Sequence, residues 1–151
     1  MAKLKQTYPG FYLYHRLVKA KLFIDRNYHT NINLYNIARE GYFSKFHFIR
    51  LFKSIYGYTP HQYMIRVRIE NAKELLMKGF NISDTCFNIG FESISSFSGL
   101  FRKIEKRTPS EFQRAHRIRQ ENIKKNPEYF IPHCFAEQNG WSKNSNFREV
   151  I

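Results

Sequence analysis

The chain has 151 residues, of which 42% are hydrophobic, so it is long enough for one ordinary domain or for two small units that share an element. Its formal net charge of +13 indicates a polyanionic partner, although a basic surface kept for solubility would give the same balance. The 2 cysteines exclude a disulfide framework and a four-cysteine zinc site, and no stretch approaches the roughly 18 apolar residues of a membrane span, so a cytoplasmic setting is expected.

A covering helix and a two-helix unit are predicted first. The covering helix has a periodic apolar stripe of Leu13, Leu17, Ala20 and Ile24. A short helix follows Asn33, whose side chain is suited to cap a first turn, and Gly41 allows a sharp turn after it. Ser44 is expected to cap the next helix, whose buried stripe is Phe48, Leu51, Phe52 and Ile55. Two helices joined in this way, the second basic on its outer face, are typical of a helix-turn-helix.

A longer helix is predicted next, because Thr59-Pro60 combines a capping residue with a proline at the first helical position. Its pattern continues to Lys78, with Gly79 as the expected C-cap. About 19 residues at 1.5 Å each span roughly 28 Å, close to the ~34 Å of one turn of DNA. Such a linker could place two recognition helices in successive major-groove segments, so that one chain acts as a monomer.

The helix-turn-helix pattern then recurs about 49 residues later, which predicts a duplicated module. Phe43, Ser44, Phe48, Phe52, Thr59 and Pro60 are matched by Phe91, Ser93, Phe97, Phe101, Thr108 and Pro109. Asn81 takes the place of the first capping asparagine, and the last helix starts at Pro109. After Arg119 the pattern fails, yet apolar residues remain in what we expect to be a partly docked extension or a tail: Tyr129, Phe130, Ile131, Phe135 and Trp141.

These motifs resemble the DNA-binding domain of the AraC/XylS family of transcription regulators over roughly residues 12 to 117. The matching positions are Ala38, Ser44, Phe52-Lys53, Thr59-Pro60, Tyr63, Arg68, Ala72, Leu75-Leu76, Gly90-Phe91, Phe97, Phe101-Arg102-Lys103, Thr108-Pro109 and Phe112. The resemblance implies an all-α fold of seven helices, with two helix-turn-helix subdomains joined by a long helix, and it implies double-stranded DNA and RNA polymerase as partners.

The expected organisation is a DNA-binding domain over residues 1–118 and a C-terminal extension over residues 119–151. Subdomain one covers about 11–58, the linker helix 60–78 and subdomain two about 80–118. The layout is similar to that of short single-domain members of the family. The chain is therefore either a complete short regulator, which the opening Met1 favours, or the C-terminal part of a longer one.

Six residues of the first copy are expected at the DNA: Ser44, Lys45, Phe46, Ile49, Arg50 and Lys53. The resemblance places base contacts at Phe46, Ile49 and Arg50. A guanidinium can donate two parallel hydrogen bonds to a guanine edge, although Arg50 could instead contact phosphate or face solvent. Phe46 and Ile49 suit a thymine methyl or, alternatively, pack against neighbouring helices. Lys45 and Lys53 are expected to contact phosphates, with solvated charge as the alternative.

The second copy offers Ser93, Ile94, Ser95, Ser98, Arg102 and Lys103 as its DNA-binding set. Gly99 stands where the first copy has Arg50, and Ser95 stands where it has Phe46. We therefore expect this half to hold the DNA backbone without reading sequence, or hardly to touch DNA. Lys106 also fills the slot of Gly57, which costs about 1 kcal/mol if that residue is left-handed.

The sequence thus predicts a sequence-specific DNA-binding transcription regulator, in the first place an activator. The alternative is an interaction protein that binds RNA polymerase or another regulator and sequesters it. No catalytic residue, metal site or cofactor is expected, because His133-Cys134 is a lone pair without an orienting third group, and no glycine-rich phosphate loop or pair of catalytic carboxylates is present.

Overall fold

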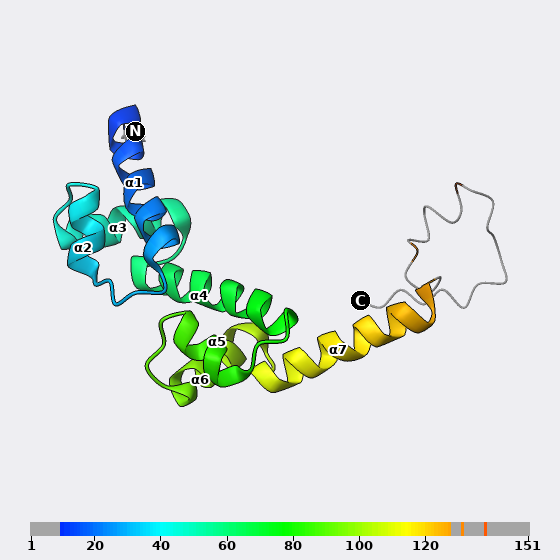
Figure 1. Cartoon of the computed structure of the whole chain (residues 1–151). Helices are drawn as coiled ribbons and strands as arrows, with labels where there is room; N and C mark the ends of the chain where they lie inside the picture. The colour runs from blue at the N-terminus through cyan, green and yellow to red at the C-terminus, as the bar shows by residue number, and fades with distance from the viewer. Residues whose placement is uncertain (1–9, 128–130, 132–137, 139–151) are drawn as a thin grey trace, which may run out of the picture.

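The computed structural model describes residues 10–127, 131 and 138, and this part of the chain contains seven helices and no strand (Figure 1). In chain order they are α1 (Phe11–Asn27), α2 (Leu34–Glu40), α3 (Lys45–Tyr56), α4 (Pro60–Met77), α5 (Ile82–Asn88), α6 (Ile94–Glu105) and α7 (Pro109–Lys125). The helices α1, α2 and α3 gather at the start of α4. The helices α5 and α6 pack along the other end of α4, and α7 starts there and extends away from the two units (Figure 1). The expected all-α fold with a long linking helix is confirmed.

Two separate hydrophobic cores hold the two units. The first contains Leu17, Ala20, Ile24, Ile37, Ala38, Phe48, Phe52 and Met64. The second contains Ile69, Ala72, Leu76, Cys86, Ile89, Phe91, Phe97, Phe101 and Phe112. Since α4 supplies side chains to both, it is the common wall of the two units rather than a bare connection between them.

Matching aromatic contacts organise the two cores. The rings of Phe48 and Phe52 lie 5.4 Å apart in an edge-on arrangement, and the ring of Phe52 lies 5.5 Å from that of Tyr63. In the second unit the Phe97–Phe101 and Phe101–Phe112 distances are 5.7 and 5.6 Å. Each fully buried phenylalanine contributes about 1.5–3 kcal/mol, and each favourable ring pair adds roughly 0.5–1.5 kcal/mol. The stripes expected from the sequence therefore form the centre of each unit.

The helix starts follow the capping residues, with one exception. Asn33, Thr59 and Thr108 form reciprocal capping boxes, and Ser93 accepts a hydrogen bond from the Ser96 amide at 3.2 Å. Ser44 occupies the N-cap position of α3, but its side chain makes no capping hydrogen bond. Ser44 is therefore the N-cap of α3 as expected, but it caps through its backbone carbonyl, which accepts a hydrogen bond from the Phe48 amide at 2.9 Å.

Two helix ends differ from the expected positions. The C-cap of α4 is Lys78, and Gly79, with φ of +92°, takes the left-handed position that follows it. At the other end of the chain α7 continues past the expected boundary at residue 118, because its residues favour helix as far as Asn126-Pro127. The extension thus begins within a helix.

The described residues include no helix that is both long enough and apolar enough to cross a bilayer. The apolar residues expected to dock from the extension lie outside the described part of the chain, Ile131 excepted, as does the His133-Cys134 pair.

Lys106 provides a stability test, because it has φ of +61° at the end of α6 where Gly57 has φ of +76° at the end of α3. Replacing Lys106 with glycine should raise the free energy of unfolding by about 0.5–1 kcal/mol, since glycine carries no Cβ penalty in this conformation. Urea denaturation measures the change. The reciprocal Gly57→Lys variant should lose a similar amount, because a Cβ there meets no atom within 4 Å and only the conformation is penalised. Equal stability of all three proteins would contradict the argument.

Candidate nucleic-acid interface

The outer face of α3 presents most of the residues expected at DNA. Ser44, Lys45, Phe46, Arg50 and Lys53 are exposed, and Ile49 is half-buried. Phe46 is 81% exposed, so this ring does not pack against neighbouring helices in the described structure. Neither Arg50 nor Lys53 forms a side-chain ion pair or hydrogen bond with any described residue. The face therefore leaves an aromatic ring and two cations unengaged, opposite the side from which Phe48 and Phe52 are buried.

The turn that introduces α3 is held by Arg16 of α1. Its Nε donates a hydrogen bond to the carbonyl oxygen of Gly41 at 2.7 Å, and a second nitrogen donates to the carbonyl oxygen of Tyr42. The guanidinium lies 4.4 Å from the centre of the Phe43 ring. Because Phe43 also packs on Phe48, the direction of α3 is fixed from the neighbouring helix.

The outer face of α6 is smaller and more polar. Ser93, Ile94, Ser95, Arg102 and Lys103 are exposed, and Ser98 is half-buried. Gly99 is exposed, and a Cβ built on it would meet no atom within 4 Å. The face thus offers two cations and short hydroxyls, with an open space at the position that Arg50 fills in α3.

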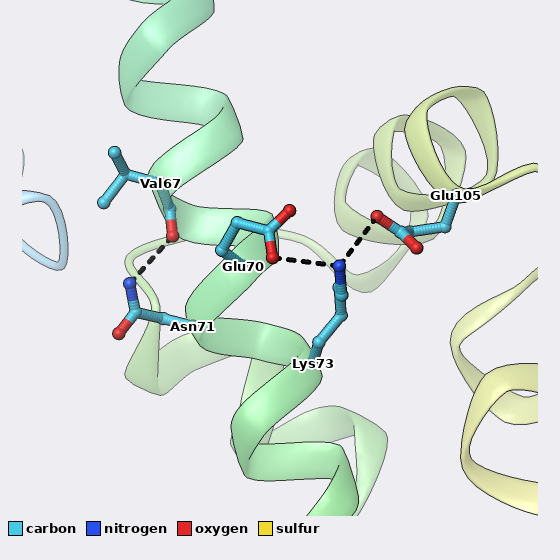
Figure 2. A network of polar contacts seen from close by, with 5 residues as sticks. All are labelled: Val67, Glu70, Asn71, Lys73 and Glu105. Atoms are coloured by element: carbon cyan, nitrogen blue, oxygen red, sulfur yellow. Dashed lines mark hydrogen bonds and ion pairs between the residues drawn. The ribbon is translucent and has the colours of Figure 1, made fainter. Parts of the chain in front are cut away.

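A polar network fixes the far end of α6 to α4, as Figure 2 shows. The Nζ of Lys73 lies 2.9 Å from an oxygen of Glu70 and 3.3 Å from an oxygen of Glu105, the last residue of α6. Burial alone would lower the pKa of Lys73, but its hydrogen bonds to the two carboxylates raise it overall. The lysine therefore stays charged and holds α6 against α4.

The first turns of α3 and α6 carry no acidic side chain, and in α6 the Ser93 hydroxyl already accepts a hydrogen bond from the Ser96 amide. The partial positive charge of the first amides is therefore not neutralised by a carboxylate there. Ser44 and Ser93 stand at these two ends. A phosphate oxygen is the kind of group that such a helix end accepts.

A cleft of about 940 Å³ between the two units contains further polar residues that sequence reasoning missed. His29 and Asn31 line it from the α1–α2 loop, His61 from the start of α4, and Ser96 from α6. His29 and Asn31 lie in a loop, which carries no periodic signal, and His61 and Ser96 lie on exposed helix surfaces, so only the fold brings these four groups together beside α6. Among the described residues no cluster of three or more histidine, cysteine or acidic side chains could hold a metal ion.

Comparison with known proteins gives the class. A family model described as "Helix-turn-helix domain" matches residues 37–115, and the fold is shared with AraC-type DNA-binding domains of known structure. The chain belongs to the AraC/XylS family of transcription regulators and carries the DNA-binding domain of that family.

Similar sequences include an uncharacterised helix-turn-helix-type transcriptional regulator of Pseudoalteromonas carrageenovora. It is 33% identical over 95 residues, which cover 63% of this chain and 57% of that protein. The probable transcription factor PqrA of Proteus vulgaris is 35% identical over 83 residues, or 54% of this chain and 68% of PqrA. The chain spans 57%, 37% and 26% of the first three curated relatives.

Similar structures include the DNA-binding domain of AdpA in complex with a target DNA. Its TM-score is 0.67 at 25% identity, covering 70% of this chain and 96% of that one. An AraC-type regulator from Chromobacterium violaceum gives a TM-score of 0.64 at 26% identity, covering 68% and 93%.

The two serines at the recognition-helix starts should differ in their effect on stability. Ser93→Ala removes a side-chain cap and should lower the free energy of unfolding by about 1 kcal/mol. Ser44→Ala should cost clearly less, because that side chain makes no capping hydrogen bond. Thermal and urea unfolding of the two variants test this, and a larger loss for Ser44→Ala would overturn the assignment of the caps.

Proposed function

We propose that the chain is a sequence-specific DNA-binding transcription regulator that places α3 and α6 in successive major-groove segments on one side of a duplex. The observation that carries this proposal is the outer face of α3, where Phe46 and Arg50 are exposed and unpaired while the opposite face is buried. Phe46 and Arg50 lie four residues apart on this helix, so an aromatic ring and an uncompensated guanidinium are presented side by side on one face. A major groove offers thymine methyl groups and guanine edges that match these two side chains.

Phosphate contacts would supply most of the affinity. Lys45 and Lys53 flank the reading face of α3, and Arg102 and Lys103 occupy the last turns of α6. Together with the helix N-termini, these cations suit a DNA backbone on both sides of each groove. The formal net charge of +13 would also attract the DNA polyanion at longer range.

The two halves are proposed to contribute differently. The residues α3 offers to bases are Phe46, Ile49 and Arg50, of which Ile49 is half-buried and contributes through its exposed part. At the corresponding positions α6 has serines and Gly99, which has no side chain. The first half would read sequence, and the second half would hold the backbone with Ser93, Arg102 and Lys103.

Activation through RNA polymerase is the proposed regulatory outcome, with residues 1–118 as the DNA-binding domain. Promoter-dependent transcription with purified polymerase distinguishes this from the alternative of a sequestering protein. An activator increases transcription only from promoters that carry its site. A sequestering protein lowers transcription from all promoters and protects no DNA.

Arg50→Ala tests the reading face. Loss of a two-point contact with a base should weaken binding to the preferred site by about 1–3 kcal/mol and relax the preference at one base pair. Lys103→Ala is the matched control, because loss of a phosphate contact should weaken binding to all sequences alike. Titration against the site and its single-base variants measures both. An unchanged sequence preference in Arg50→Ala would remove Arg50 from the reading face.

Salt dependence tests the backbone contacts. If about six phosphates are neutralised, affinity should fall about 10³-fold between 50 and 200 mM monovalent salt through counterion release. The slope of log affinity against log salt should become less steep in Lys53→Ala and in Lys103→Ala. An affinity that stayed flat over this range would contradict a phosphate-dominated interface.

A further inference from the structure

The two units touch directly as well as through α4. The contact joins the α1–α2 loop of the first unit to the α5–α6 turn of the second. A Cβ built on Gly90 would lie 2.5 Å from the carbonyl oxygen of His29, so the two backbones approach as closely as a glycine permits. Tyr28, the C-cap residue that follows α1, packs its side chain against the core of the second unit.

Arg68 of α4 lies at the centre of this contact and is 9% exposed. Its Nε donates a hydrogen bond to the carbonyl oxygen of Tyr28 at 2.7 Å, and its Nη2 donates to that of Thr30 at 3.0 Å. Its guanidinium also lies 5.4 Å from the centre of the Phe91 ring. One side chain thus joins the loop of the first unit to the turn of the second.

The first unit contains a similar arginine, Arg16, whose hydrogen-bond partners differ from those of Arg68. Arg16 lies over Phe43 as Arg68 lies over Phe91, and Phe43 and Phe91 are equivalent positions of the repeat. Arg16, however, donates to the carbonyls of its own unit's turn. Arg68 donates to carbonyls of the other unit. In the second copy the arginine therefore joins two units instead of closing one.

Burial of a cation in this position is unfavourable unless its donors are used. Burial lowers the pKa of Arg68, and the negative charge of Glu92 in the same turn opposes that shift. The planar fork of a guanidinium fits two carbonyl oxygens at once, which an ammonium cannot do with the same geometry. The contact is therefore specific to arginine.

We propose that Arg68 is a positioning residue that, with Gly90, locks the α1–α2 loop against the α5–α6 turn and so fixes the separation and phase of α3 and α6. The proposal deepens the proposed function, on which its DNA-binding consequence rests. A locked pair presents the second unit to the DNA backbone at one fixed distance from the bases that the first unit reads. Without the lock, α4 could bend between its two cores and that distance would vary.

The first test measures the distance between the units without DNA. Spin labels are attached to cysteines placed at the exposed positions Ser54 of α3 and Ser110 of α7. Cys134 is replaced by serine, and Cys86 is retained because it is fully buried. The parent protein should give one narrow distance distribution. Arg68→Lys and Gly90→Ala should each widen it roughly twofold, since hinge motions of packed units become accessible.

Two control variants separate the lock from general damage. Arg66→Ala removes an exposed arginine two residues away that contacts Tyr58 instead of the other unit. Gly79→Ala adds a Cβ at φ of +92° where no atom lies within 4 Å, so it carries the backbone strain of Gly90→Ala without the clash. Both should keep the narrow distribution. Circular dichroism and a melting curve establish that each variant is folded at the temperature used.

A broad distribution in the parent protein would overturn the proposal without any variant. So would a narrow, unchanged distribution in folded Arg68→Lys or Gly90→Ala. Since these measurements contain no DNA, a failure of the proposed function leaves them valid.

A hydroxyl-radical footprint on the selected site provides the second test. The parent protein should protect two patches about 10 base pairs apart. Folded Arg68→Lys should keep the patch of the first unit and lose most of the second, whereas Arg66→Ala should keep both. Two intact patches in Arg68→Lys would show that the lock does not position the second unit. No footprint with any protein would contradict DNA binding while leaving the distance result in place.

Discussion

The rest of the structure depends on the burial of α4 in two cores at once. Met64 closes the first core, and Ile69, Ala72 and Leu76 form part of the second. The helix therefore ends one unit and opens the next. It also starts 49 positions after α1, at Pro60 against Phe11, and both helices are long. The duplication thus includes the covering helix: α1 is to the first unit what α4 is to the second, and α7 stands where a third such helix would begin.

In this arrangement the buried core residues are constrained, whereas the exposed residues of α3 and α6 are free to vary. Ring contacts between Phe52 and Tyr63 and between Phe101 and Phe112 tie α3 to α4 and α6 to α7. Any change there disturbs a core in which side chains are fully buried. The outer faces of α3 and α6 have no such constraint, since they make few contacts within the described structure. Two units with equivalent cores can therefore have different residues on the outer faces of α3 and α6.

Local signals were enough to predict the helices. The capping residues Asn33, Thr59 and Thr108 and the prolines that follow two of them gave the starts, because a cap depends only on residues within one turn. Ser44 gave the correct start of α3, although a serine at the N-cap need not turn its side chain to the helix. The end of α7 was missed because an exposed polar helix has no apolar stripe to follow. Arg68 was noticed only as part of a motif, and its contact with Tyr28, 40 residues away, had no local signal.

Gly99 shows how the outer face of α6 could change. It lies in the middle of α6, is exposed, and has empty space where a first side-chain carbon would be. A glycine within a helix lowers its stability by about 1 kcal/mol relative to alanine. The chain thus accepts a weaker helix at the position where the first copy has its arginine. A single substitution at Gly99 could strengthen the helix and extend a side chain outward without moving a core atom. If α6 lies in a major groove as proposed, such a substitution would add a base contact without a loss of folding stability.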